Sequence, residues 1–142
     1  MEKTYSISQV SKVLEIPSST LRYYDSLDLL PDLQKSANGV RQFSQADINT
    51  LRIIECLKRS GLSIKEIQKF TDLIAQGDDS IEERRKMFYD ARANFAKKMA
   101  EMQETMNVLD FKCAYYDQAV ADGTEVDVQK QMSLSKIVPV GE

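Results

Sequence analysis

The fold is decided by the stretch Pro17-Ser18-Ser19-Thr20-Leu21-Arg22-Tyr23-Tyr24-Asp25, which follows a first helical pattern almost without a break. Ser6-Ile7-Ser8-Gln9 fits a capping box, so a helix is predicted to begin at Ile7. Because proline has no backbone N–H to donate, it is favoured in a first helical turn, and a second helix is predicted from about Pro17 to Ser26. The connection between them is only Glu15-Ile16. Two short helices joined so tightly are typical of a helix-turn-helix.

A small hairpin is predicted directly after these helices. Asn38-Gly39 favours the positive φ angles of a tight turn, and residues 33–35 and 40–43 flank it as short strands. A hairpin that follows a helix-turn-helix is a wing.

Two further helices are predicted after the hairpin. Ser44-Gln45-Ala46-Asp47 begins the first, which ends at Gly61. Its apolar residues recur at helical spacing, at Ile48, Leu51, Ile54 and Leu57. Ser63-Ile64-Lys65-Glu66 is another capping box and opens the second helix, which runs to Gly77. Residues 1–77 are therefore predicted to form one winged helix-turn-helix domain in a mainly all-α protein.

One long helix is predicted beyond this domain. It begins at Ser80, with Glu83 as capping-box partner, and no Gly or Pro interrupts it before Gly123. A helix of about 40 residues is unusual against a mean near 11–12. Its apolar positions alternate by three and four from Met99 onward and form what we call the seam: Phe88, Ala91, Phe95, Met99, Met102, Met106, Leu109, Cys113, Tyr116 and Val120.

The seam predicts a partner helix, because a lone helix cannot bury it. Residues 78–122 are therefore expected to pair two copies of the chain into a homodimer. Residues 123–142 contain no second helix strong enough to cover the seam and are expected to form a loosely ordered tail.

Composition excludes several functional classes. The chain has no histidine, which removes Ser-His-Asp and Cys-His catalysis and the commonest metal ligand. Two cysteines without a CxxC pair leave no zinc cluster. We therefore expect neither an enzyme nor a metal or cofactor site. No apolar run is long enough for a bilayer and the N-terminus lacks a signal-peptide core, so no membrane partner and a cytoplasmic location are expected.

The net charge of −3 hides a difference between the two halves of the chain. Residues 1–77 carry 10 Lys/Arg and 9 Asp/Glu, whereas residues 78–142 carry 9 and 13. A protein that binds nucleic acid needs positive charge only where it touches phosphate. A balance of +1 is weak support for such a partner in the first half.

The second predicted helix carries the candidate DNA contacts. Hydroxyl and guanidinium groups that can reach base edges and phosphates crowd into its first positions, at Ser18, Ser19, Thr20, Arg22 and Tyr23. Lys35 and Arg41 of the hairpin and Lys58 of the third helix would extend phosphate contacts to either side. Any surface helix can carry such residues, so the inference rests on their shared placement around one helix-turn-helix.

Five segments carry a closer resemblance by their order and spacing: residues 20–25, 29–31, 38–44, 47–48 and 61–67. Together they resemble the MerR family of bacterial transcriptional regulators over residues 4–74, and the long helix that follows is of the family's kind. The resemblance implies an antiparallel coiled-coil homodimer that binds double-stranded promoter DNA at a pseudo-palindromic operator. Such regulators distort the promoter so that RNA polymerase can engage it.

Carried over residue by residue, the resemblance implies DNA-backbone contacts for Arg22, Tyr23, Arg41 and Lys58, and base-edge positions for Ser19 and Thr20. The chain also departs from the family pattern. Glu15 occupies a turn position where glycine is common, at a cost of about 1 kcal/mol if the backbone is left-handed there. Gln34, Lys35 and Gln42 stand at wing positions that are frequently arginine, which predicts a shallower salt dependence of binding.

Cys56 is the candidate for sensing a chemical signal. With the stretch Leu57–Ser63 after it, this cysteine resembles the AdhR- and NmlR-like branch of the family, which is linked to aldehyde and other electrophile stress. At 100° per residue, it lies about 140° from the centre of its helix's apolar face. Arg52 and Arg59 are helical neighbours that favour the reactive thiolate, whereas the nearby C-terminal helix dipole disfavours it.

Other interpretations remain open for the two cysteines. Cys56 could be a small apolar filler packed against the long helix, which is the commoner fate of a free cysteine. Cys113 lies on the seam and is expected to be core. Metal sensors of the family place cysteines at the start of the long helix and beyond its end, but residues 77–85 and 123–142 contain none. The drug-binding relatives carry a separate effector domain, and we expect none in these 142 residues.

A second hypothesis comes from another functional class. The chain could be a coiled-coil interaction or scaffold module without a DNA role, whose N-terminal helices bind a protein. Retardation of a labelled promoter fragment in a gel separates the two hypotheses, because a scaffold would not retard it at physiological salt.

Overall fold

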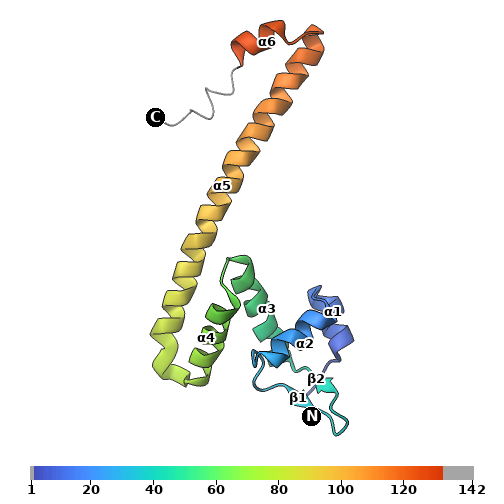
Figure 1. Cartoon of the computed structure of the whole chain (residues 1–142), viewed down its shortest axis with the longest axis vertical. Helices are drawn as coiled ribbons and strands as arrows, with labels where there is room; N and C mark the ends of the chain where they lie inside the picture. Colours follow the sequence, from blue (N-terminus) through green and yellow to red (C-terminus); the bar gives the residue numbers. More distant parts are fainter. Residues whose placement is uncertain (1, 133–142) are drawn as a thin grey trace. The chain divides into compact units, whose positions relative to one another are not determined.

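The computed structural model describes residues 2–132 (Figure 1). The chain divides into two compact units, Met1–Asn94 and Phe95–Glu142. The long helix contributes its first part to one unit and the rest to the other. The fold is mainly helical with one two-stranded hairpin, as predicted.

Helices α1 (Ile7–Leu14) and α2 (Ser18–Ser26) form the predicted helix-turn-helix. The Ser6 hydroxyl accepts from the Gln9 amide at 3.1 Å, and the Gln9 side chain accepts from the Ser6 amide at 2.8 Å, so the first capping box is confirmed. Glu15 adopts the left-handed conformation with φ 56°. Pro17 is the N-cap of α2 rather than a residue of its first turn, so the helix begins one residue later than predicted.

The hairpin is shorter than predicted. Strands β1 (Gln34–Lys35) and β2 (Arg41–Gln42) pair antiparallel, with Lys35 opposite Arg41. Gly39 takes the positive φ of 78° that the turn requires. At the base of the wing, Tyr5 and Phe43 exchange both backbone hydrogen bonds, at 2.8 and 2.9 Å. This bridge anchors the wing to the segment that precedes α1.

Helices α3 (Gln45–Arg59) and α4 (Ile64–Ala75) both begin with a capping box. Ser44 and Asp47 cap α3, and Ser63 and Glu66 cap α4. Each box satisfies backbone N–H groups that have no partner within the helix. The local sequence therefore determines where both helices begin.

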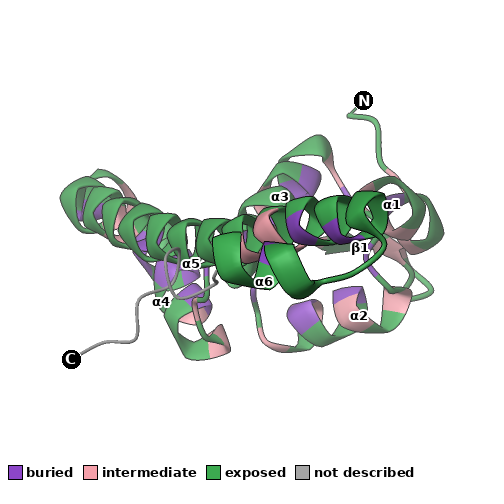
Figure 2. Ribbon diagram, turned by 90° about the horizontal axis from the view of Figure 1, so that it is seen from above, coloured by how far each residue is buried: buried purple, intermediate pink, exposed green. Residues whose placement is uncertain are grey.

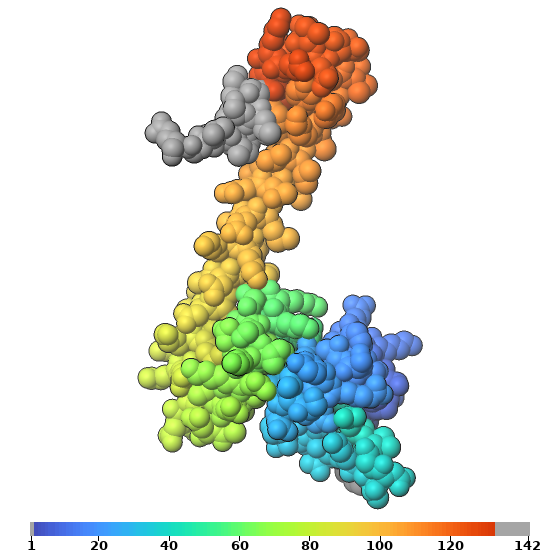
Figure 3. All heavy atoms as spheres, in the orientation of Figure 1, coloured from blue at the N-terminus to red at the C-terminus, as the bar shows by residue number. Residues whose placement is uncertain are grey.

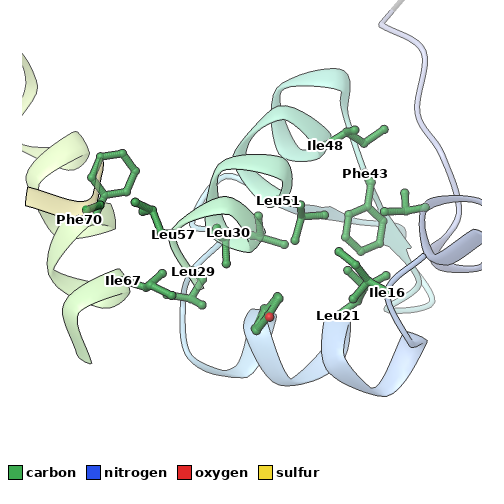
Figure 4. Packing of buried hydrophobic residues seen from close by; sticks show 14 residues of the cluster. Ile16, Leu21, Leu29, Leu30, Phe43, Ile48, Leu51, Leu57, Ile67 and Phe70 are labelled. Carbon is green, nitrogen blue, oxygen red and sulfur yellow. The ribbon is translucent and has the colours of Figure 1, made fainter. Parts of the chain in front are cut away.

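One hydrophobic core joins these elements in the first unit. Figure 4 shows side chains from α2, α3 and α4 packed together with residues of the connecting segments. Leu21 of α2, Leu51 and Ile54 of α3 and Ile67 of α4 are completely buried. Each fully buried aliphatic side chain contributes roughly 1.5–3 kcal/mol. The core fixes one side of α2, so its opposite side faces solvent.

The junction between α4 and the long helix differs from the prediction. A 3₁₀ turn, η1 (Gly77–Ser80), precedes α5 (Ile81–Asp122, 42 residues). The buried Ser80 hydroxyl lies against the carbonyl oxygens of Leu73 and Gly77 and accepts from Arg84 Nε at 2.9 Å. The predicted capping box with Glu83 is therefore wrong, because η1 runs directly into α5 and Ser80 binds backward to α4.

Helix α5 exposes most of its length, as Figure 2 shows. The seam residues within the second unit are all exposed, among them Met102 at 72% and Val120 at 81%. Cys113, which the sequence places in a core, is also exposed in the single chain. Within residues 2–132 we find no helix with the length and hydrophobicity of a membrane span.

Helix α6 (Val126–Gln131) departs from the predicted loosely ordered tail. Val128 is buried against Tyr115 and Ala119 of α5, and Phe111 packs against the same cluster. The Tyr115 hydroxyl and the Glu125 carboxylate lie 3.0 Å apart. The prediction is wrong for residues 126–131 because tertiary packing stabilises a helix too short to be stable alone. The rest of the predicted tail, residues 133–142, lies outside the described residues.

Candidate DNA-binding surface

Helix α2 presents a polar stripe on the side opposite the core. Leu21 and Tyr24 are buried, and they hold the helix in place. Ser19, Arg22 and Tyr23 lie three and four positions apart and are exposed. A helix that is fixed on one side and offers hydroxyl and guanidinium groups on the other suits the reading of a nucleic-acid groove.

The remaining candidate residues of α2 lie at the edge of this stripe. Ser18 and Thr20 are half-buried in the first turn. Their helix has no side-chain cap at Pro17, so its first amides lack a side-chain acceptor. The positive end of a helix dipole favours a phosphate at such a position. Among residues 2–132, Arg22 forms no ion pair, and its guanidinium is available to an anion.

The wing lies beside α2, and ion pairs connect the two elements. In Figure 3 the cyan residues of the hairpin adjoin the blue residues of α2. Arg41 Nε donates to Asp25 Oδ2 at 2.7 Å, and Lys35 Nζ lies 3.4 Å from the same oxygen. The structure thus brings two predicted contact residues together with an acidic residue that the sequence reasoning did not single out.

Lys58 is engaged with α2 rather than free. Its Nζ donates to the Tyr24 hydroxyl at 3.2 Å and lies 5.7 Å from the centre of the Tyr24 ring. The same hydroxyl donates to Glu55 Oε1 at 2.6 Å. Burial, together with the hydrogen bond to the Glu55 carboxylate, raises the pKa of Tyr24. The phenol therefore stays neutral and links α2 to α3, and a phosphate contact by Lys58 stays a prediction.

Cys56 is exposed on α3, as its position away from the apolar face predicts. Leu57, the next residue, lies about 100° further round the helix and is buried. Packing of the Cys56 thiol in the core of its own chain is therefore not observed. Across residues 2–132 no group of three or more Cys, Asp or Glu side chains is placed to hold a metal ion.

Sequence reasoning missed Asp25 and Glu55 because their partners are distant in the chain. Arg41 lies 16 residues from Asp25, and Glu55 lies 31 residues from Tyr24. The one available signal was the place of Asp25 at the end of the motif that decides the fold.

Comparisons with known proteins agree with this geometry. The model of the MerR HTH family regulatory proteins matches residues 5–73, and that of the MerR DNA-binding region matches residues 48–110. An uncharacterized HTH-type transcriptional regulator of Haemophilus influenzae is 35% identical over 121 residues, which are 85% of this chain and 90% of the relative. The regulator AdhR of Bacillus subtilis is 34% identical over 87 residues, 61% of this chain and 62% of AdhR.

Solved structures extend the likeness to three dimensions. A crystal structure of HiNmlR, a MerR family regulator lacking the sensor domain and bound to promoter DNA, has 34% identity and a TM-score of 0.77. The match covers 87% of this chain and 98% of HiNmlR. A MerR family regulator from Listeria monocytogenes has 27% identity and a TM-score of 0.75, over 91% of this chain and 99% of that one.

These relatives are transcriptional regulators and not enzymes, and they set aside the hypothesis of a scaffold without a DNA role. With a family model over its N-terminal half and a relative that matches most of its length, this chain belongs to the MerR family of DNA-binding transcriptional regulators.

Proposed function

We propose that two copies of this chain pair through α5 and bind a pseudo-palindromic promoter operator. Residues 1–77 bind DNA and residues 78–122 form the dimer helix. The observation that carries the proposal is the exposed stripe of Ser19, Arg22 and Tyr23 on α2, beside the wing cations. In each half-site α2 enters the major groove, with Ser19 and Thr20 near base edges, and Arg22, Tyr23, Lys35, Arg41 and Lys58 along the phosphates.

The exposed seam supports the homodimer. Large apolar side chains on an isolated helix lose stabilisation of roughly 25 cal/mol for every Å² left in water. Met99, Met102, Met106 and Leu109 are each more than half exposed in the single chain. Helix α6 covers Tyr115 and Ala119 instead, so it leaves the seam open for a second α5. The family resemblance favours an antiparallel pair.

Two-fold symmetry of the dimer explains why the operator should be pseudo-palindromic, because each copy reads the same half-site in opposite directions. Bending or untwisting the DNA between the half-sites would act on RNA polymerase indirectly, through promoter geometry. HiNmlR was seen bound to promoter DNA, which supports the same kind of target here. The protein would then act in the cytoplasm, at the nucleoid.

A footprint on the promoters of neighbouring genes tests this proposal. The wild-type chain should protect two half-sites and make the DNA between them hypersensitive to cleavage. Arg22→Ala should weaken the complex about tenfold, because a charge-assisted phosphate contact is lost. Lys97→Ala, which removes an exposed positive charge from α5, is the matched control and should leave the affinity unchanged. Equal losses in both variants would mean that only overall charge matters.

We propose further that an aldehyde or another electrophile switches the regulator by modifying Cys56. Exposure of the thiol and the likeness to AdhR and HiNmlR support this role. With an aldehyde, the thiolate sulfur would bond to the carbonyl carbon, and the carbonyl oxygen would take a proton from water to give a hemithioacetal.

Cys113 provides a matched control for the sensor role, since it is the second exposed thiol. In cells challenged with formaldehyde or methylglyoxal, Cys56→Ser should abolish promoter induction, whereas Cys113→Ser should retain it. Unchanged induction in Cys56→Ser would sink the sensor role. If Cys56→Ser loses DNA binding without any challenge, a packing role in the dimer explains the residue better.

A further inference from the structure

Three charged groups meet where α2 joins the wing. Asp25 lies on α2, whereas Lys35 and Arg41 lie directly opposite each other on β1 and β2. Both cations contact the same oxygen, Asp25 Oδ2, at 3.4 and 2.7 Å. The Asp25 side chain is only 14% exposed, compared with 26% for Arg41 and 49% for Lys35. The carboxylate is thus enclosed by the wing, and the cations retain the solvent-facing side.

Among residues 2–132, these contacts leave most of the wing's hydrogen-bond donors without a protein acceptor. A guanidinium has five N–H donors, and Arg41 uses its Nε–H for Asp25, so both terminal amino groups remain available there. Lys35 likewise has three ammonium hydrogens and one acidic neighbour here. Asp25 therefore orients the two cations without occupying the atoms that would bind phosphate.

The wing has few other restraints. Each of its strands has two residues, and an isolated two-stranded hairpin is at best marginally stable in water. The bridge between Tyr5 and Phe43 fixes its base. The ion pairs with Asp25 are the polar side-chain link that the described residues provide between the strands and α2.

We propose that Asp25 is a positioning residue that sets the register between the recognition helix α2 and the wing. This inference rests on the proposed binding of operator DNA by α2 and the wing. Asp25 holds the Arg41 and Lys35 side chains in place before DNA binds. Binding therefore costs less side-chain conformational entropy. At the same time its negative charge opposes phosphate. Specific binding should therefore depend on Asp25, whereas non-specific binding should be slightly hindered by it.

A positioning role predicts that loss of the Asp25 charge weakens operator binding but not non-specific binding. A purely electrostatic role predicts that the same loss strengthens both. Asp25→Asn keeps the shape of the side chain and removes its charge. For the duplex that the wild-type chain protects in a footprint, we expect the Kd of the full chain to rise about tenfold. For a scrambled duplex of the same length, the Kd should stay the same or fall, because a negative charge near the phosphates is gone. Both are measured by fluorescence anisotropy over a series of salt concentrations.

Asp32→Asn is the matched control, because this exposed residue lies between α2 and β1 and forms no ion pair among residues 2–132. The same charge change there should not weaken operator binding. A double-mutant cycle adds a measurement that a general loss of folding would not reproduce. In an Arg41→Gln background, Asp25→Asn should weaken operator binding by less than twofold, because the residue it orients is absent.

The inference is overturned if Asp25→Asn binds both duplexes more tightly by the same factor, or if its effect is undiminished in the Arg41→Gln background. An unchanged Kd for the operator would overturn it as well. If the wild-type chain protects no promoter duplex at all, the proposed function fails first. The wild-type footprint therefore tells the two failures apart.

Discussion

The core of the first unit, which includes the seam residue Ala91, contrasts in one respect with the seam residues beyond Asn94. In the first unit Leu21, Leu51 and Ile67 are buried by neighbours from the same chain. Along α5, Met102 and Leu109 recur at helical spacing but remain exposed. The first region completes its own packing, whereas the second is incomplete in one copy. We therefore expect that the stability of the DNA-binding unit and the assembly of the regulator can be changed separately.

The largest effect should come from the self-completed region. Leu51→Ala removes a completely buried side chain from α3 and should lower the free energy of unfolding by about 2–5 kcal/mol. Urea denaturation followed by circular dichroism, at a fixed protein concentration, measures this loss. Val13→Ala, at a residue 66% exposed on α1, is the control and should change stability by less than about 0.5 kcal/mol. Similar losses in the free energy of unfolding for Leu51→Ala and Val13→Ala would contradict the view that the buried core stabilises this unit.

A charge on the seam should act on assembly instead. Met102→Asp should weaken the dimer at least about a hundredfold, because each of the two copies loses the burial of a methionine, roughly 1.5–3 kcal/mol. Sedimentation velocity over a range of concentrations measures the dimer Kd, and the urea stability of the dissociated chain should be unchanged. Ala100→Asp places the same charge on an exposed position off the seam and should leave the dimer intact. A dimer that tolerates both changes would exclude this seam as the interface.

A polar link between α2 and α3 contributes to the stability of the first unit alongside its apolar core. Tyr24→Phe removes the hydrogen bond to Glu55 and should cost about 1.5 kcal/mol. Because the pKa of Tyr24 is raised above its ordinary value of 10.0, the folded chain holds this proton more tightly than the unfolded chain. Its contribution to stability is complete below pH 10 and is lost as the pH rises further.

Thermal melts between pH 8 and pH 11 test this pH dependence. The wild-type chain should lose stability above pH 10, and Tyr24→Phe should lose less over the same range. Tyr116→Phe, at an exposed tyrosine of α5, should retain the wild-type profile. If all three profiles coincide, Tyr24 does not couple the two helices through its proton.

The smallest effect concerns the turn of the helix-turn-helix. Glu15→Gly should raise the free energy of unfolding by about 1 kcal/mol, because glycine adopts the observed φ of 56° without a steric penalty. Asp28, with φ 59°, offers a comparison. Asp28→Gly should gain less, since aspartate visits this region more readily than glutamate. Urea denaturation measures both variants against the wild-type chain. A smaller gain in the free energy of unfolding for Glu15→Gly than for Asp28→Gly would contradict this account.

Local signals predicted most of the fold. Capping boxes at Ser6 and Ser63 specify where α1 and α4 begin, since each requires only residues three positions apart. The same reasoning was wrong at Ser80, the last residue of the 3₁₀ turn η1. Its hydroxyl donates to the carbonyl oxygen of Leu73 and does not cap the amide of Glu83. It also missed α6, whose stability depends on the contact of Val128 with the far end of α5.

The candidate site could be predicted only in part. The exposed stripe of α2 follows from helical spacing, so Ser19, Arg22 and Tyr23 could be identified from the sequence. The partners of the charged residues could not, because Asp25–Arg41 and Tyr24–Glu55 are contacts across the fold. Spacing along a chain carries no information about which of several carboxylates a distant cation will meet.

Helix α6 has a consequence for the size of the assembly. Near its end α5 carries two apolar stripes, and a helix with two such stripes can recruit neighbours on two sides and grow into an open bundle. By seating Val128 on Tyr115 and Ala119, the chain closes one stripe with its own residues. With one stripe left exposed, we expect two chains to pair rather than a larger bundle to form. Helix α6 would then favour the dimer by covering apolar surface that could bind further chains.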